Sequence, residues 1–200
     1  MGFSYRNRRV FENFDTQFES NRVSALVGPS GSGKSTLLAA IAGYTRPQVG
    51  NIWFARPDGQ RKEPTAHDVT WIAQDANVLS ARTAIDNVLI GVLSDGQSYS
   101  DASERAVAAL RAVGLGDLMH ERCRTLSGGE KQRVAIARSL ASNRPLVVAD
   151  EPSAGLDEAN TRSLAKLFST IAGRATVIVA THDPVMMEAA SAVIRLRERQ

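Results

Sequence analysis

A chain of 200 residues with 43% hydrophobic and 22% charged side chains has the composition of one ordinary globular domain, large enough for a real core. Its apolar stretches are only as long as strands and its first residues lack the apolar segment of a signal peptide, so we expect a cytoplasmic protein without a transmembrane helix. A net charge of +3 with scattered arginines argues against a nucleic-acid partner. The single cysteine, Cys123, excludes an internal disulfide and a cysteine zinc site.

The first part of the chain alternates short apolar runs with helical patterns, the order typical of an α/β domain. Aromatic and polar residues alternate over residues 14–18, and a similar alternation follows over residues 51–55. Both patterns predict half-buried antiparallel strands beside a main sheet. Residues 22–27 predict a buried strand that leads into a helix at residues 35–42. Another strand is expected at residues 69–73.

The stretch from residue 83 to residue 125 indicates mainly helical structure. Asp101 and Glu104 have the spacing of a helix-capping pair, and the apolar side chains that follow recur at helical intervals. Ser127 and Glu130 then form a capping box at the start of another helix. We interpret this part of the chain as a helical subdomain inserted into a core that carries the sheet.

The last part of the chain returns to the α/β order. Pro145 precedes the first of these elements, and Asp183 is a suitable N-cap for the last. A strand, a helix, a strand and a short helix are expected in turn at residues 146–150, 158–172, 175–181 and from 184 onward.

A glycine-rich loop joins the strand at residues 22–27 to the helix at residues 35–42. Its sequence, Gly-Pro-Ser-Gly-Ser-Gly-Lys-Ser-Thr, fits the phosphate-loop pattern G-x-x-x-x-G-K-[ST]. Glycines let the backbone wrap a phosphate, Lys34 reaches the β- and γ-phosphate oxygens, and the Ser35 hydroxyl ligates Mg²⁺. The residues predicted to bind the nucleotide are Gly28, Ser30, Gly31, Gly33, Lys34, Ser35 and Thr36. A plain turn is the alternative, and the match at every fixed position disfavours it.

A second anion-binding helix start follows at residues 126–132, Leu-Ser-Gly-Gly-Glu-Lys-Gln. A Ser-Gly-Gly turn presents bare backbone N–H groups and the positive end of a helix dipole to an anion. Ser127, Gly128 and Gly129 are therefore predicted to bind phosphate. One nucleotide needs only one such helix start, so we expect the second to serve a nucleotide held by another subunit.

These two motifs, followed by the apolar segment Leu146–Asp150 and by Glu151, resemble those of the ATP-binding cassette (ABC) family, and the resemblance covers nearly the whole chain. It implies an α/β fold: a P-loop NTPase core with a mainly parallel sheet flanked by helices, an antiparallel β subdomain, and an inserted helical subdomain that carries the Ser-Gly-Gly signature. The whole chain is expected to be one ABC ATPase domain. Its core would span about residues 1–82 and 145–200, and the helical subdomain about residues 83–144.

The resemblance also implies roles for single residues. Asp150 orders the hydration shell of Mg²⁺, and Glu151 is the general base or positions the attacking water. Gln74 matches the glutamine that contacts Mg²⁺ and water, while its loop meets a membrane partner. His182 matches the histidine that hydrogen-bonds the γ-phosphate beside the general base. Asp157 matches a loop along the dimer seam and is also a plausible N-cap, and it can be both.

Tyr5 stands about where the family carries an aromatic side chain that stacks on adenine. Stacking needs only a flat ring, so other aromatic residues can take this role. Phe3, Phe11 and Phe14 are the nearby alternatives, of which Phe14 has the pattern of a core residue.

The resemblance implies an ATP-binding and ATP-hydrolysing subunit of an ABC transporter. Two such subunits, most simply two identical copies, would dimerise around two Mg-ATP and drive separate membrane-embedded permease subunits. The protein would then be peripheral on the inner face of the cell membrane. The surface from Gln74 to about Leu93, with Val78, Leu79 and Ile85, would receive the permease, unless these apolar side chains belong to the core.

Two other classes remain open. A soluble ABC ATPase, for example in cofactor assembly or nucleic-acid maintenance, would have the same motifs and no membrane partner. A P-loop kinase leaves the motif at residues 127–130 unexplained. Within the transporters, residues 126–152 look most like the bacterial branch that exports macrolides and releases lipoproteins.

Overall fold

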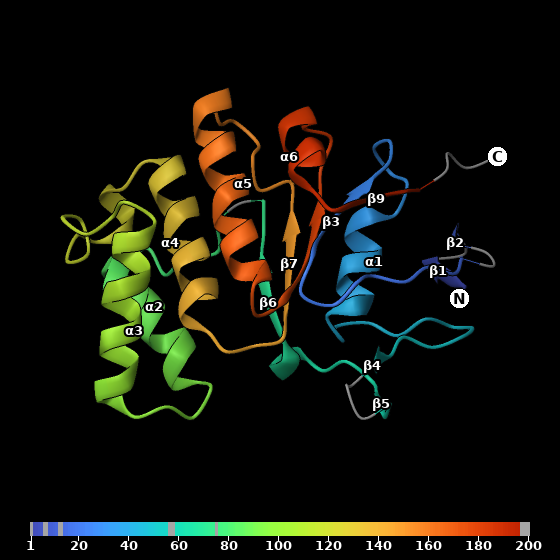
Figure 1. The fold of residues 1–200 in the computed structure, drawn as a ribbon, viewed down its shortest axis with the longest axis horizontal. Helices are drawn as coiled ribbons and strands as arrows, with labels where there is room; N and C mark the ends of the chain where they lie inside the picture. The colour runs from blue at the N-terminus through green and yellow to red at the C-terminus, as the bar shows by residue number, and fades with distance from the viewer. Residues whose placement is uncertain (1, 6–7, 12–13, 56–58, 75, 197–200) are drawn as a thin grey trace.

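A five-stranded parallel sheet forms the centre of the molecule, and helices cover both of its faces (Figure 1). The computed structural model describes residues 2–5, 8–11, 14–55, 59–74 and 76–196; of residues 3–5 and 8–11 it describes the backbone alone. The order of the strands is β6-β7-β8-β3-β9. They are β3 (Val23–Val27), β6 (Val69–Ile72), β7 (Leu146–Asp150), β8 (Thr176–Ala180) and β9 (Ala192–Arg195).

The sheet confirms the buried strands expected at residues 22–27, 69–73, 146–150 and 175–181 and adds β9, which the sequence patterns do not predict. β9 has only four residues, of which Ala192 to Ile194 are apolar, and its residues alternate between half-buried and exposed, so its apolar run is shorter than those of the buried strands. Because all five strands are parallel, their carboxyl ends lie along one edge of the sheet. Asp150 lies opposite Ala180 in this register, and β3 pairs directly with β8. The loops that follow β3, β7 and β8 are therefore neighbours at that edge, where parallel sheets bind ligands.

The two faces of the sheet pack into separate apolar cores. Helix α1 (Lys34–Ile41) covers one face, and α5 (Glu158–Ala172) and α6 (Pro184–Ala189) cover the other (Figure 1). Alternate residues of a strand point to opposite faces, so neighbouring residues of β7 belong to different cores. The predicted helix at residues 158–172 is confirmed at both ends, with Asp157 as its N-cap.

Three helices gather at one side of the molecule and pack on one another: α2 (Ala84–Leu93), α3 (Tyr99–Ala112) and α4 (Gly128–Ala141) (Figure 1). The expected capping pair of Asp101 and Glu104 is wrong. α3 begins earlier because the Ser98 side chain accepts a hydrogen bond from the N–H of Asp101, which lies in the first helical turn. A 3-10 turn, η2 (Cys123–Thr125), leads into α4.

The antiparallel part is smaller than the sequence patterns predict. Residues 14–19 form no strand, although Phe14 and Phe18 are half-buried against the core on the α1 side. Their alternation reflects the packing of these two aromatic side chains on the core. A pair of short strands, β4 (Phe54–Ala55) and β5 (Arg61–Lys62), accounts for only the end of the second predicted strand. The backbones of β1 (Phe3–Tyr5) and β2 (Arg8–Phe11) form another antiparallel pair, and a 3-10 turn, η1 (Ala66–Asp68), precedes β6.

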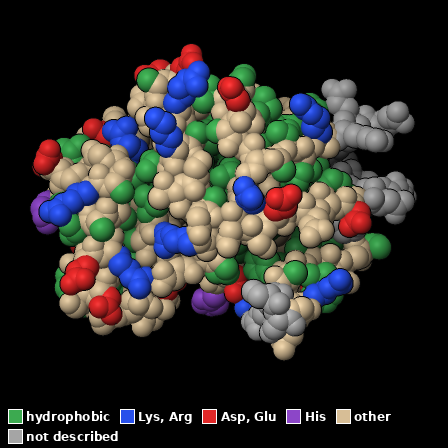
Figure 2. Space-filling view, viewed as in Figure 1, with side chains coloured by type: hydrophobic (Ala, Val, Ile, Leu, Met, Phe, Trp, Pro, Cys, Tyr) green, Lys and Arg blue, Asp and Glu red, His purple; other side chains and the backbone are tan. Residues whose placement is uncertain are grey.

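In the part of the chain that the structure describes, every helix is too short or too polar to cross a lipid bilayer. Figure 2 shows the Lys and Arg side chains of one face as separate spots among acidic and apolar ones.

Candidate functional site: a nucleotide-binding edge of the sheet

The phosphate loop connects β3 to α1 and leaves the first helical N–H groups unpaired. Gly31 and Gly33 have φ values of 77° and 98°, in the left-handed region that favours glycine. The N–H groups of residues 34–36 have no hydrogen-bond partner among the described residues, as expected for the first turn of a helix. The Lys34 ammonium donates to the carbonyl of Gly28 at 2.8 Å. Three free N–H groups and a lysine within one loop fit a phosphate group.

Lys34, Glu151 and His182 meet at the carboxyl edge of the sheet, although they lie far apart in the sequence. Glu151 Oε1 is 3.8 Å from Lys34 Nζ, and Glu151 Oε2 is 2.9 Å from His182 Nδ1. The backbone N–H of His182 also donates to Oε2, at 3.3 Å. The Glu151 side chain is 15% exposed, whereas that of His182 is 79% exposed. Glu151 is thus held from two sides, and His182 is open to a ligand.

Glu151 has an unusual backbone conformation. Its φ of 46° lies in the left-handed region, which costs a residue other than glycine about 1–3 kcal/mol. A hydrogen bond from its N–H to the carbonyl of Ala180, at 2.8 Å, fixes the turn after β7 against the neighbouring strand β8. The strained turn aims the Glu151 side chain at Lys34 and His182.

The oxygens predicted to hold Mg²⁺ are free. Neither the Asp150 carboxylate nor the Ser35 hydroxyl has a partner among the described residues. Asp150 is half-buried at the end of β7 and Ser35 is exposed. A carboxylate and a hydroxyl are ligands that Mg²⁺ accepts when phosphate and water complete its shell, so these residues fit the ion. Gln74 is exposed after β6, and no hydrogen bond joins its side chain to Asp150, Ser35 or another described residue.

The signature motif forms a complete capping box. The Glu130 carboxylate accepts the N–H of Ser127 at 2.7 Å and its hydroxyl at 2.8 Å, and the Ser127 hydroxyl accepts the N–H of Glu130 at 3.3 Å. The bond from the backbone, and then that from the hydroxyl, lower the pKa of Glu130. No hydrogen bond or ion pair within the described residues joins this helix start to Lys34, Glu151 or His182.

Packing within the chain does not require glycine at the signature. A Cβ added to Gly128 would meet no atom within 4 Å, and one added to Gly129 would only touch Leu156, at 3.7 Å. The space beside these glycines is open to another molecule. Asp157 follows Leu156 in the chain. Its carboxylate accepts the N–H of Asn160 at 2.8 Å and caps α5, so the capping role predicted for Asp157 is confirmed.

Several predicted residues fall outside this cluster. The backbone of Tyr5 ends β1, and its side chain lies outside the described residues, as do those of Phe3 and Phe11. Of the apolar residues after Gln74, Val78 and Ile85 pack against the core, whereas Leu79 is 51% exposed.

Sequence reasoning missed two residues that shape the loop after Gln74. Asn87 is buried, accepts the N–H of Leu79 at 2.7 Å and donates to the carbonyls of Leu79 and Thr83. Arg138, from α4, donates to the carbonyl of Asn77 at 3.2 Å. An asparagine inside an apolar helix was the available signal, because a buried amide needs partners.

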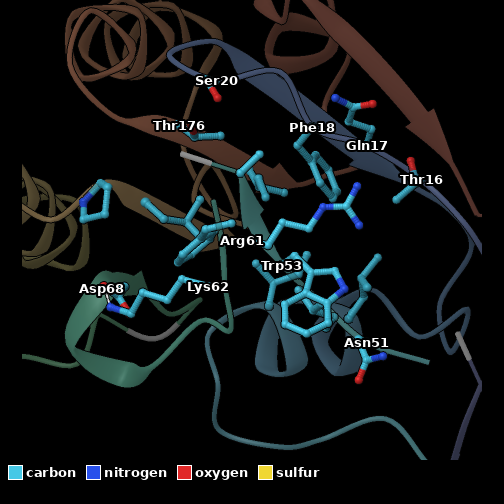
Figure 3. Close-up of a pocket in the computed structure, with 18 of the residues that line it drawn as sticks. Thr16, Gln17, Phe18, Ser20, Asn51, Trp53, Arg61, Lys62, Asp68 and Thr176 are labelled. Atoms are coloured by element: carbon cyan, nitrogen blue, oxygen red, sulfur yellow. Dashed lines mark hydrogen bonds and ion pairs between the residues drawn. The ribbon is translucent and has the colours of Figure 1, made fainter. Parts of the chain in front are cut away.

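A cavity of about 910 Å³ lies away from this edge, and none of the residues predicted to bind nucleotide or Mg²⁺ lines it. It lies between residues 14–21, the pair β4–β5 and α1. Figure 3 shows the Arg61 side chain reaching across it between Phe18 and Trp53. The carboxylate at its side, Asp68, is already paired with Lys62 at 2.7 Å.

Comparison with known proteins agrees with this geometry. The ABC transporter family matches residues 11–154. Uncharacterized ABC transporter ATP-binding proteins of Mycobacterium tuberculosis are 38% identical over 182 residues, covering 88% of this chain and 55% of theirs. The chain thus spans about half the length of these relatives.

Two shorter relatives are covered over most of their length. The cell division ATP-binding protein FtsE of Escherichia coli is 38% identical, with 88% of this chain and 82% of FtsE aligned. The lipoprotein-releasing system ATP-binding protein LolD of Saccharophagus degradans is 34% identical, with 94% and 86% aligned.

Among solved structures, a dimeric ATP-binding cassette in a post-hydrolysis state with ADP and Pi superimposes with a TM-score of 0.84. It is 26% identical, and the superposition covers 98% of this chain and 90% of that one. Family match, relatives and fold therefore agree with the two motifs predicted to bind phosphate and with the Glu151 cluster: the chain belongs to the ABC transporter family.

Proposed function

We propose that this chain binds and hydrolyses ATP as the ATP-binding subunit of a membrane transporter. The observation that carries the proposal is the meeting of Lys34, Glu151 and His182 beside the free N–H groups of α1. These groups place a cation, a carboxylate and an exposed imidazole beside one helix start. This combination suits phosphoryl transfer to water, in which the protein mainly positions groups and neutralises charge.

The residues of the cluster divide the work. Lys34 leaves the Gly28 carbonyl for the phosphate oxygens, and the N–H groups of residues 34–36 hold the phosphate at the helix start. Mg²⁺ held by Ser35 and Asp150, with Gln74 toward its water, neutralises phosphate charge when bound. Glu151 orients the attacking water and accepts its proton at a carboxylate oxygen.

Two subunits complete the site. Ser127, Gly128 and Gly129 of one copy would close over the γ-phosphate held by the other, and Asp157 would lie along the seam. The open space beside Gly128 supports this arrangement, because glycine there serves no packing purpose inside the chain. Both half-sites are present in this sequence, which favours a homodimer. The dimeric state of the solved cassette supports it as well.

The membrane partner would bind the exposed apolar side chains after Gln74 and along α2. These side chains are Leu79, Ile90 and Leu93, which are 51%, 47% and 38% exposed. A permease would place the protein at the inner face of the membrane. A soluble ABC ATPase is the alternative, and it predicts a soluble partner instead.

Replacement of Glu151 with glutamine tests the hydrolysis step. The amide keeps the size of the side chain and cannot accept the proton, so we expect ATP-dependent dimers and a loss of turnover of about 100-fold or more. Glu104→Gln, which changes an exposed carboxylate on α3, is the matched control and should keep full turnover. Near-normal turnover of the Glu151→Gln variant would remove Glu151 from the reaction.

The partner can be identified by co-purification. A tagged Glu151→Gln variant, solubilised from its native host with ATP and Mg²⁺, should retain a polytopic membrane protein. The added substitution Leu79→Glu should release that protein and leave the ATP-dependent dimer intact. Recovery of a soluble protein alone would favour the soluble class.

The same co-purification decides the branch of the family. The relative named for lipoprotein release supports the export branch, whereas the cell-division relative is the more identical of the two. The architecture of the retained permease distinguishes export from import.

Tyr5 is tested by kinetics. Tyr5→Ala should raise the KM for ATP severalfold with little change in kcat, because stacking on adenine contributes to binding and not to the chemical step. Tyr5→Phe keeps the ring and should retain the parental KM. An unchanged KM in Tyr5→Ala would exclude Tyr5 from the nucleotide site.

A further inference from the structure

A dense polar network lies at the amino edge of the sheet, opposite the nucleotide. The Arg144 guanidinium donates from Nε to Asp95 Oδ1 at 2.9 Å and from Nη1 to the carbonyl of Val69 at 2.8 Å. Its Nη2 donates to the Ser94 hydroxyl at 3.3 Å. Ser94 and Asp95 follow α2, and Val69 begins β6. A single side chain thus joins the end of α2 to the start of the sheet.

The same network holds the end of α4. The Ser142 hydroxyl, immediately after α4, donates to Asp95 Oδ2 at 2.9 Å and accepts the N–H of Arg144 at 3.2 Å. Arg174, between α5 and β8, donates to the carbonyls of Ser142 and Leu140. A cation at these carbonyls also favours the negative end of the helix dipole. We call Asp95, Ser142, Arg144 and Arg174 the α4 anchor.

The anchor is well enclosed. The Asp95 and Arg144 side chains are 14% and 22% exposed, and Ser142 is buried. Both carboxylate oxygens of Asp95 are used, one by Arg144 and one by Ser142. Hydrogen bonds to an enclosed charged pair are stronger than those at an open surface and leave little freedom in the angle between the joined elements.

We infer that the α4 anchor positions the signature end of α4 toward the nucleotide of the partner subunit. This inference rests on the proposed function. The anchor touches no predicted nucleotide-binding residue, so Asp95, Ser142 and Arg144 are positioning residues that act through the helix. α4 begins at the Ser-Gly-Gly motif and ends at the anchor, and it connects the two as a rigid rod.

The length of the rod makes the position of the signature sensitive to the anchor. The 14 residues of α4 span about 21 Å, so a tilt of about 5° at the anchor moves its first turn by about 2 Å. Hydrogen bonds from N–H groups to phosphate tolerate only a few tenths of an ångström. A tilt of α4 should not displace the phosphate loop, because α1 packs in the other core.

Asp95→Ala is the decisive variant. It removes the acceptor for both Arg144 and Ser142 and leaves every predicted nucleotide-binding residue in place. Asp68→Ala is the matched control: it removes another ion pair before β6, with 16% of the Asp68 side chain exposed, but one that joins Lys62 and not α2 or α4. Both variants are made in the Glu151→Gln parent and in the active protein.

Three measurements separate positioning from general damage: binding of a fluorescent ADP to the monomer, ATP-dependent dimerisation in the Glu151→Gln parent, and turnover against protein concentration. For Asp95→Ala we expect parental ADP affinity, a dimer dissociation constant raised at least about tenfold, and turnover that recovers as the protein concentration rises. Asp68→Ala should dimerise like its parent.

Parental dimerisation of Asp95→Ala overturns the inference, and so does an ADP affinity that falls by the same factor as dimerisation. If Asp95→Ala does not fold, Ser142→Ala, which removes the hydrogen bonds of the Ser142 hydroxyl to Asp95 and to the N–H of Arg144 but keeps the pair of Asp95 and Arg144, must show the same pattern at smaller amplitude. A Glu151→Gln parent that forms no ATP-dependent dimer instead refutes the proposed function, and the role of the anchor with it.

Discussion

Replacing Gly28 with alanine measures how closely the phosphate loop is packed on the strand beneath it. The added Cβ would lie 2.6 Å from Ser32 Oγ, 3.1 Å from Leu196 Cβ and 3.2 Å from the Leu196 carbonyl oxygen. The Ser32 hydroxyl can rotate away. The backbone of Leu196 has less freedom, because its N–H donates to the carbonyl of Val27 at 2.7 Å. Part of the overlap is therefore unavoidable.

The contacts of the added Cβ with Ser32 and with Leu196 should lower the free energy of unfolding by amounts that can be measured separately. Overpacking of this kind typically destabilises by about 1–3 kcal/mol, so we expect Gly28→Ala to lower the free energy of unfolding by about 2 kcal/mol. Ser32 Oγ is buried and has no partner in the part of the chain described. Ser32→Ala should thus be nearly neutral alone, and in the double variant it should recover about 1 kcal/mol by removing the shortest contact.

Equilibrium urea unfolding of the wild type, the two single variants and the double variant gives this coupling directly. Gly128→Ala is the matched control: its added Cβ meets nothing within 4 Å, so its unfolding free energy should not fall. Strictly additive effects of Gly28→Ala and Ser32→Ala, or a Gly28→Ala variant within about 0.5 kcal/mol of wild type, would refute the reasoning.

Four further predictions concern the signature, the strained turn and the thiol. Ser127→Ala should lose about 1 kcal/mol of unfolding free energy by urea unfolding, because it removes an N-cap; no loss would contradict the capping box. The pKa of Glu130 is lowered from its ordinary value of 4.5 on folding, so this carboxylate stabilises above pH 4.5 and loses that effect as the pH falls further; wild type and Glu130→Gln should converge in acid. Glu151→Gly should abolish turnover yet leave the unfolding free energy unchanged or raised by about 1 kcal/mol, since glycine relieves the positive φ; a clear drop would argue against strain. Cys123 is buried and burial raises its pKa, so a thiol reagent should label it only as fast as the protein unfolds, and immediate labelling of native protein would contradict its burial.

The phosphate loop and the signature could be predicted because their function is local. A helix start that binds an anion needs glycines and a cap within a few residues, and both motifs lie in continuous sequence. The strands β3, β7 and β8 were equally clear, because buried parallel strands are continuous apolar runs bounded by turn residues.

The predictions that were wrong or missing concern elements whose formation depends on a neighbouring segment. The segment at residues 14–18 alternates like a strand, but the structure assigns it to no strand, and Phe14 and Phe18 pack against the core instead. β9 has an apolar run of only Ala192 to Ile194, which is too short to predict a strand alone, and its pairing with β3 makes it part of the sheet. The start of α3 depended on whether Ser98 or Asp101 acts as the N-cap. In the structure the Ser98 hydroxyl accepts the N–H of Asp101, so the helix begins at Tyr99.

The sequence by itself determined which residues can bind a nucleotide, because that capacity belongs to short motifs. Only the tertiary structure decided their relation. Parallel pairing of β7 with β8 brings Glu151 beside His182, 31 positions away, whereas no hydrogen bond or ion pair of the described residues joins the signature to either. The tertiary structure also decided that Arg144 and Asp95 form an ion pair in the α4 anchor. The two charges are far apart in the sequence, and they meet only because the fold brings the ends of α2 and α4 together.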